Sequence, residues 1–367
     1  METFAETCSE DVRARTLRES ETQYAGNPHV RVDEGADASR LLCETSRRKF
    51  IGTSLAFAAG VGCTSVCSGD EAAQVLPFGG GSGSARSFSL DNRCTLRMPV
   101  AGIRKPVNFF VIGDTHFGFH DSRDDAYADN YKRMAQWPSP KDALAKALTR
   151  AKKAHADAVM LVGDIISFPS LANLDHLRAE LDRFGLPWLY VAGNHDWHFE
   201  GDSGSDFEQR ARWVERRLKP LYQGENPLMY ARMVKGVRMV MIDNSAYHVT
   251  PEQLAFWKQE AAKGDPIALF MHIPLWIEGW SIITCGNPRW GAATDPYWKI
   301  ERRERWAERL MPSTYAFREA VFNTPNLVGI FTGHIHSLMV GQAGNALLFS
   351  VPSNRDGSCM EVRLSPP

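Results

Sequence analysis

The sequence lacks an excess of charge of either sign, which argues against one broad class of partner. Its 367 residues include 42 Lys and Arg against 43 Asp and Glu, a formal net charge of −1. A protein that binds nucleic acid through phosphate contacts needs a basic face or stripe. We therefore expect no nucleic-acid partner.

Cysteine is sparse, and no repeat of the length typical of solenoids or propellers occurs. The seven cysteines form no ladder of paired spacings, which excludes a disulfide-stapled scaffold. In an exported protein, one disulfide could form among Cys94, Cys285 and Cys359. Hydrophobic residues make up 44% and charged residues 23%, as in soluble globular proteins, and the length suits one large domain or two small ones.

No long hydrophobic run is present either. The run from Phe50 to about Val66 is rich in Gly, Ala, Ser and Thr and is a poor membrane span. It follows the basic patch Arg47-Arg48-Lys49 and precedes a polar stretch, an order that resembles a twin-arginine export signal. That resemblance implies transient contact with an export machinery and a periplasmic or cell-surface location in a bacterium. The alternative is a basic pair that precedes an Ala-rich helix.

Composition divides the chain into four parts. Residues 1–45 are polar without a stable period, and are either a disordered extension or a stretch upstream of the true start. Residues 46–70 are the signal-like segment, and the Gly- and Ser-rich residues 71–87 are a flexible linker. We expect one folded domain over 88–367.

Within that domain, short apolar runs typical of buried strands each stop in a polar cluster. A glycine begins four of these clusters, and glycine permits positive φ and close backbone approach. The pairs are Val107–Ile112 before Gly113-Asp114-Thr115-His116, Ala158–Val162 before Gly163-Asp164, Pro187–Ala192 before Gly193-Asn194-His195-Asp196, Ile267–Met271 before His272, and Leu327–Thr332 before Gly333-His334-Ile335-His336.

Helical patterns separate some of these strands. Residues 141–155 place apolar side chains three and four residues apart, and Thr250 with Gln253 forms a capping box that opens a helix to about Ala262. Residues 228–243 are typical of a hairpin around Lys235-Gly236. This alternation predicts an α/β fold with a mixed sheet, in which ligands bind at strand ends.

The strand ends supply two carboxylates, one amide and four imidazoles. Oxygen and imidazole donors without thiolate suit Mn, Fe or Zn. Seven donors exceed the needs of one ion, whereas two divalent or trivalent ions about 3.5–4 Å apart can share one bridging carboxylate. A lone Asp or His at a strand end is usually a cap or a solvated loop residue, so the ordered set carries the prediction. The donors are Asp114, His116, Asp164, Asn194, His272, His334 and His336.

The motif order Asp-x-His, Gly-Asp, Gly-Asn-His-Asp, His and Gly-His-x-His resembles that of the calcineurin-like metallophosphoesterases, over roughly residues 107–355. The resemblance implies a four-layer αββα sandwich with mixed β-sheets. It also implies the division of the donors: Asp114, His116, Asp164 and His336 for the first metal, and Asp164, Asn194, His272 and His334 for the second, with Asp164 bridging.

The same resemblance implies roles for the neighbouring side chains. Asn194 and His195 would contact a small phosphoester substrate, and His195 would protonate the leaving oxygen after attack by metal-bound hydroxide. Asp196 would orient His195, and His198 could reach the substrate. The remaining histidines are expected on the surface or in loops: His120, His155, His176 and His248.

The reaction expected is hydrolysis of a phosphomonoester or phosphodiester, so the chain would be a phosphoric ester hydrolase. The alternative is a catalytically inactive member that binds a ligand or partner, although no motif residue is lost. Ser167 stands where the purple acid phosphatase branch has Tyr, which disfavours that branch.

An aromatic-rich insertion at 274–326 follows His272 and is either a helical packing element or a lid over the substrate. A second insertion, Phe117–Trp137, could border the entrance.

Overall fold

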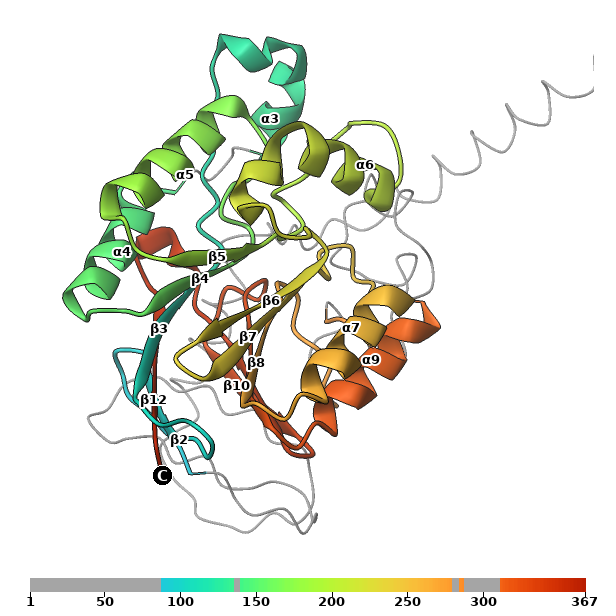
Figure 1. The fold of residues 1–367 in the computed structure, drawn as a ribbon. Helices are drawn as coiled ribbons and strands as arrows, with labels where there is room; N and C mark the ends of the chain where they lie inside the picture. The colour runs from blue at the N-terminus through green and yellow to red at the C-terminus, as the bar shows by residue number, and fades with distance from the viewer. Residues whose placement is uncertain (1–86, 135–138, 279–283, 287–310) are drawn as a thin grey trace, which may run out of the picture. The chain divides into compact units, whose positions relative to one another are not determined.

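The structure is a computed structural model that describes residues 87–134, 139–278, 284–286 and 311–367 (Figure 1). These residues belong to one compact unit within Thr53–Pro367. The predicted signal segment and nearly all of the linker lie outside the described residues, as do Trp280, Trp290, Tyr297, Trp298 and Trp306 of the insertion. In the part of the chain that is described, no helix has the length and apolar character needed to cross a membrane.

The described residues form two mixed six-stranded sheets. The first has the order β1-β2-β12-β3-β4-β5 and the second β10-β11-β9-β8-β7-β6. The bounds in the first sheet are β1 Ser89–Leu90, β2 Thr95–Pro99, β12 Met360–Ser365, β3 Val107–Ile112, β4 Ala158–Val162 and β5 Trp188–Val191. Those in the second are β10 Met339–Ala343, β11 Ala346–Ser350, β9 Leu327–Thr332, β8 Ile267–Phe270, β7 Val237–Ile242 and β6 Met229–Val234.

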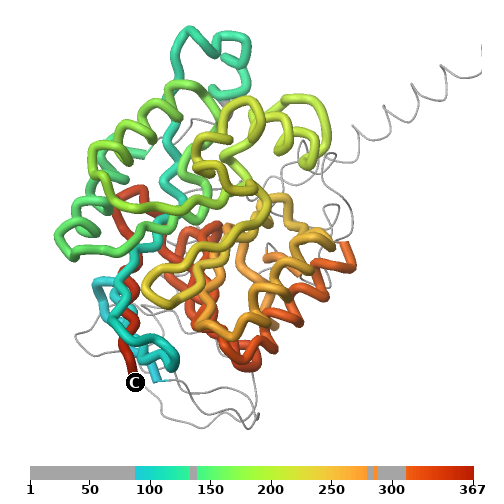
Figure 2. The backbone as a smooth tube through the Cα atoms, viewed as in Figure 1, coloured from blue at the N-terminus to red at the C-terminus, as the bar shows by residue number. Residues whose placement is uncertain are grey.

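Helices cover the outer face of each sheet, α4 and α5 on the first and α7 and α9 on the second (Figures 1 and 2). The α-helices are α3 Ala128–Met134, α4 Ala143–Lys153, α5 Leu171–Phe184, α6 Asp206–Trp213, α7 Pro251–Ala261 and α9 Pro312–Phe322. Shorter turns of helix occupy Ser122–Tyr127, Val214–Leu218, Lys219–Tyr222 and Asn354–Asp356.

The inner faces of the two sheets pack against each other through aromatic side chains. The ring centroid of Phe109 on β3 lies 5.6 Å from that of Phe270 on β8 and 5.5 Å from that of Phe331 on β9. Edge-to-face pairs at this separation stabilise a core beyond the area they bury. The four-layer αββα sandwich predicted from the motifs is thereby confirmed.

The parallel pairings decide where the strand ends meet. In the first sheet β3, β4 and β5 are parallel neighbours, and in the second β7, β8, β9 and β11 are. The carboxyl ends of parallel strands lie at the same edge of a sheet, so each sheet delivers its polar motifs to one edge.

The local predictions for the regular elements are confirmed. The apolar positions Leu144, Ala147, Leu148 and Ala151 of α4 are buried, and Thr250 forms both bonds of a capping box at α7. The hairpin of β6 and β7 turns at Lys235 and Gly236, whose φ values are 48° and 92°. Two successive positive φ values suit the right-handed twist of a hairpin.

His248 lies in a loop, as expected, but it is buried there, and the possible disulfide is not formed. His248 is only 2% exposed, and its Nδ1 accepts the N–H of Met311 at 3.1 Å, because this loop folds beneath the start of α9. Cys94, Cys285 and Cys359 are all free and buried. The Cys285 thiol donates to the Tyr247 carbonyl at 3.3 Å instead of joining a second sulfur.

The described end of the insertion packs against the fold. Phe317 and Val321 of α9 are buried, and Phe317 lies against Trp257 of α7 with a centroid distance of 6.0 Å. The packing interpretation therefore holds for α9, while the lid interpretation concerns residues outside the described part.

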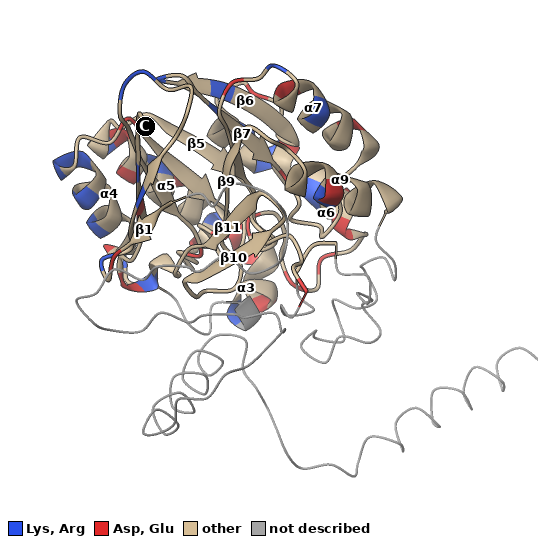
Figure 3. Ribbon diagram, turned by 90° about the horizontal axis from the view of Figure 1, so that it is seen from below, with Lys and Arg blue, Asp and Glu red and all other residues tan. Residues whose placement is uncertain are grey.

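Figure 3 colours the ribbon by residue type, and both acidic and basic positions occur along α7 and α9. The expectation of no nucleic-acid partner stays a prediction.

Candidate metal centre

All seven predicted donors lie just beyond the carboxyl ends of strands. Asp114 and His116 follow β3, Asp164 follows β4 and Asn194 follows β5 in the first sheet. In the second sheet, His272 follows β8, and His334 and His336 follow β9. The site therefore forms where the ends of the two sheets meet.

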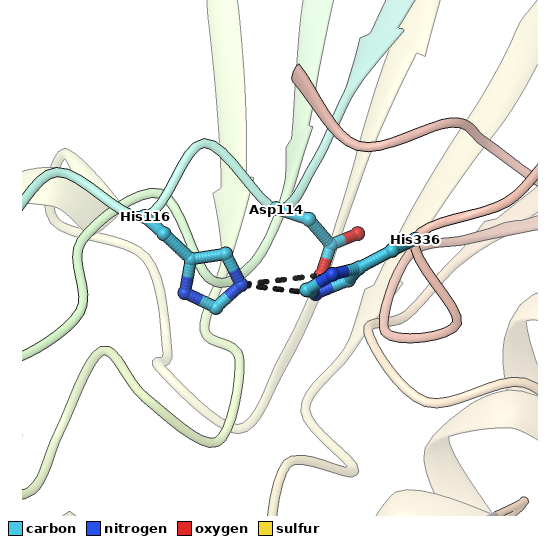
Figure 4. Close-up of side chains that lie close together, drawn as sticks. All are labelled: Asp114, His116 and His336. Atoms are coloured by element: carbon cyan, nitrogen blue, oxygen red, sulfur yellow. Dashed lines mark hydrogen bonds and ion pairs between the residues drawn. The ribbon is translucent and has the colours of Figure 1, made fainter. Parts of the chain in front are cut away.

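One group of donors joins Asp114, His116 and His336 (Figure 4). His116 Nε2 lies 3.0 Å from His336 Nε2 and 3.9 Å from Asp114 Oδ1. His336 Nε2 lies 3.3 Å from the same Asp114 oxygen. Two ring nitrogens that face each other beside a carboxylate oxygen form a cluster suited to a cation.

A second group joins Asp164, His272 and His334. Asp164 Oδ2 lies 3.1 Å from His272 Nε2, which in turn lies 3.1 Å from Asn194 Oδ1. The same Asp164 oxygen lies 3.8 Å from His116 Nε2 of the first group. Asp164 thus lies between the two groups, where a bridging carboxylate would lie, and it forms a third group with His116 and His195.

The backbone of the donors is strained. Five of them have positive φ, namely Asp114 at 56°, His116 at 54°, Asp164 at 51°, His334 at 71° and His336 at 57°. Left-handed conformations cost free energy for residues with a Cβ, and such residues cluster at functional sites.

The glycines beside the donors mainly permit close approach. A Cβ on Gly193 would lie 2.1 Å from Asp164 Oδ1, and one on Gly333 would lie 2.5 Å from Asp114 Oδ2. Of the four glycines that precede donors, Gly163 has positive φ, at 85°. Positive φ was expected of these glycines, but it falls mostly on the donors themselves.

Further hydrogen bonds orient the imidazole rings. His272 Nδ1 donates to the Val162 carbonyl at 2.8 Å, which leaves Nε2 toward Asp164. Tyr247 Oη and His334 Nε2 share a hydrogen bond of 2.8 Å. Such outer contacts fix ring orientation in metal sites.

Asp196 braces the turns that carry the donors. Its Oδ2 accepts the N–H groups of Gly193 at 2.7 Å and Asp164 at 3.0 Å, and its Oδ1 accepts that of Ile166 at 3.0 Å. Burial, followed by the charge of Asp164, raises the pKa of Asp196 to about 7. These contacts tie β4 to β5, and the predicted role of orienting His195 stays a prediction.

The electrostatics of the rings fit a cation site. Burial lowers the pKa of both His116 and His334 to about 3, so both rings are neutral near pH 7 and can act as donors. Burial opposes protonation of His272 too, but the Asp164 carboxylate outweighs it and raises the pKa of His272 to about 9. A buried Asp164 therefore holds a positive charge beside it, which a metal ion would supply in place of the proton.

The predicted substrate contacts lie beside these groups. The backbone N–H of His195 donates to Asp164 Oδ1 at 2.8 Å. The His195 ring stands edge-on to the ring of His116, with a centroid distance of 4.8 Å. His198 is 5% exposed, and its Nδ1 donates to the Asn194 carbonyl at 3.0 Å. His198 is therefore a buried neighbour of the turn, with its ring 6.2 Å from that of His195.

Sequence reasoning missed one strand end. β7 stops at Ile242 and is followed by Asp243-Asn244-Ser245, the same signal as at the five motifs. Asn244 exchanges two hydrogen bonds with the backbone of Ile273, of 2.7 and 3.0 Å, and so holds the residue after His272. Tyr247 lies three residues further on.

Comparisons with known proteins find several similar chains. A probable cyclic nucleotide phosphodiesterase from Psychrobacter arcticus is 29% identical over 115 residues, which span 30% of this chain and 40% of the relative.

Among solved structures, a dimetal phosphatase from Danio rerio gives a TM-score of 0.44 at 14% identity, covering 69% of this chain and 89% of that one. A purple acid phosphatase from yellow lupin seeds gives a TM-score of 0.46 at 12% identity, and the match covers 72% of this chain and 47% of that one. The family model described as calcineurin-like phosphoesterase matches residues 107–338. The chain belongs to the calcineurin-like phosphoesterase family.

Proposed function

We propose that this protein is a dinuclear metal-dependent hydrolase of a small phosphoester. The observation that carries the proposal is the convergence of donors from five strand ends, with Asp164 close to both His116 and His272 and with Asn194 beside His272. The donor set fits Mn, Fe or Zn, because it offers carboxylate, amide and imidazole atoms without thiolate.

Two bound ions would polarise the phosphoryl oxygens and acidify water to a nucleophile near pH 7. The first would be held by Asp114, His116, Asp164 and His336, and the second by Asp164, Asn194, His272 and His334. The neutral rings of His116 and His334 support their use as donors, since a doubly protonated ring has no free lone pair for a metal.

The chain itself supplies the remaining chemistry. We assign His195 to donate a proton to the departing oxygen, with Asn194 and His198 beside the substrate. The hydrogen bond from the backbone N–H of His195 to Asp164 Oδ1 supports this role, because it fixes the position of His195 relative to the centre. General acid catalysis of this kind contributes about 10²–10⁴-fold to rate.

The test is a panel of chromogenic phosphomonoesters and phosphodiesters, with the full chain reconstituted separately with Mn, Zn and Fe. We expect turnover that a chelator abolishes and that added metal restores, together with about two metal ions per chain. Two bound ions without turnover of any ester would instead support a ligand-binding member of the family.

We also propose that the chain is exported by a twin-arginine route. The supporting observation is the sequence Arg47-Arg48-Lys49 before the apolar run that begins at Phe50. Replacing Arg47 and Arg48 together with Lys should leave the precursor in the cytoplasm, because the receptor reads the arginine pair. Unchanged export of this variant in a fractionation assay would refute the route.

A further inference from the structure

A segment without a predicted role lies against the metal centre. The 3₁₀ helix Asn354–Asp356 follows β11, and the hydroxyl of Ser353 donates to the Asp114 carbonyl at 2.7 Å. The N–H of Asn354 donates to the Gly113 carbonyl at 3.0 Å. These bonds fix the next residue, Arg355, relative to the turn that carries Asp114 and His116.

Arg355 differs from the other arginines that are partly or fully buried. Its Nε is buried without a hydrogen-bond partner, as are those of Arg238 and Arg318, but within the described residues the guanidinium of Arg355 has no ion pair. Each other buried or partly buried arginine whose side chain is described has an Asp or Glu partner within 4.0 Å. These arginines are Arg150, Arg210, Arg212, Arg217, Arg232, Arg238 and Arg318.

The charge of Arg355 acts on the metal centre. It interacts with the carboxylates of Asp114 and Asp164 and also lowers the pKa of His116. Burial lowers the pKa of Arg355 itself despite those two carboxylates. Arg355 is partly buried, and a desolvated guanidinium without a paired anion costs free energy. Metal cations beside it would increase the excess of positive charge.

We propose that Arg355 binds a non-bridging oxygen of the substrate's phosphoryl group and favours a terminal phosphomonoester over a phosphodiester. This inference rests on the proposed function, because it concerns the substrate of the same centre. The guanidinium fork matches phosphate oxygens and forms strong charge-assisted hydrogen bonds with them.

The charge balance gives the reason for the preference. Asp114 and Asp164 offset half the charge of two divalent ions, and Arg355 adds one more positive charge to the remainder. A phosphomonoester is a dianion above its second pKa of about 6, whereas a phosphodiester carries a single charge. The dianion therefore gains more from Arg355, and it also presents one more free oxygen to the guanidinium.

The test compares Arg355→Gln with the wild-type full chain, both loaded with Mn at pH 8. Calorimetry with inorganic phosphate should show binding weakened about 10- to 100-fold, the range for losing charge-assisted hydrogen bonds. The kcat/KM for p-nitrophenyl phosphate should fall at least about 10-fold more than that for bis(p-nitrophenyl) phosphate. Metal content should be unchanged.

Arg150→Gln is the matched control, because Arg150 is also partly buried but pairs with Glu361 at 3.5 Å. It should lower the melting temperature without changing phosphate affinity or the ratio of the two esters. Arg355→Lys keeps the charge and serves if Arg355→Gln loses metal or fails to fold. It should keep the ester ratio within about 3-fold while binding phosphate more weakly than the wild type does.

Unchanged phosphate affinity in Arg355→Gln, or in Arg355→Lys where only that variant folds, would overturn the inference. An equal loss on both esters would overturn the monoester preference. Wild-type protein that hydrolyses neither ester would refute the proposed function, while phosphate binding would still decide the role of Arg355.

Discussion

Replacing Gly193 with Ala tests whether close backbone approach builds the centre. The added Cβ would lie 2.1 Å from Asp164 Oδ1 and 2.3 Å from Asp164 N, where ordinary contact begins at 3.4 Å. Neither side can move freely, because the Gly193 N–H donates to Asp196 and the His195 N–H donates to Asp164 Oδ1. The substitution must therefore displace the carboxylate that lies between the two donor groups.

The expected loss of stability combines two effects. Overpacking costs about 1–3 kcal/mol, and each buried hydrogen bond that breaks costs about 1–3 kcal/mol. We expect the free energy of unfolding to fall by about 4 kcal/mol and the melting temperature by about 10 °C. Metal content should fall, and kcat should drop at least about 100-fold because a displacement of about 1 Å is enough for that.

Differential scanning fluorimetry, elemental analysis and ester turnover together measure these effects. Gly264→Ala is the control, since Gly264 has φ of +81° but nothing within 4 Å of the new Cβ. It should cost about 1–2 kcal/mol from backbone strain and leave metal content unchanged. A Gly193→Ala protein that keeps two metals, wild-type turnover and a melting temperature within about 2 °C would refute the reasoning.

Three further predictions concern single side chains. Asp164→Asn should reduce the metal content by more than one ion per chain, because a bridging ligand serves both ions; elemental analysis that still finds two ions would contradict bridging. His195→Ala should retain both ions while kcat drops about 10²–10⁴-fold, and less for esters with good leaving groups; loss of metal would make His195 a ligand. Burial raises the pKa of Asp206 from its ordinary value of 3.8 to about 6, so ionisation of Asp206 progressively destabilises the folded state as pH rises from 3.8 through 6. Asp206→Asn should therefore raise the free energy of unfolding by about 1–3 kcal/mol at pH 8 and by little below pH 4 in urea titrations; an equal effect at both pH values would rule out this cause.

Much of the fold could be predicted because its signals are local. β3 and β9 have the bounds that their apolar runs indicate, and α7 begins at the predicted capping box. The seven candidate donors could be located for the same reason, since each stands at the end of a buried strand. The burial of His248 could not be predicted from local signals, because it depends on contact with the start of α9, more than sixty residues further along the chain.

The sequence by itself determined the polar motif at the end of each strand and the candidate donor atoms that the motifs carry, because residue type and short-range periodicity encode these properties. Only the tertiary structure decided how two sheets bring those ends together and which backbone positions carry the strain. It also decided that Tyr247 reaches His334, 87 residues away, and that Arg355 lies partly buried near the centre without an ion pair to any described carboxylate. Contacts between segments far apart in the chain cannot be recognised from the local sequence, because they arise from the packing of the sheets and the burial of charge.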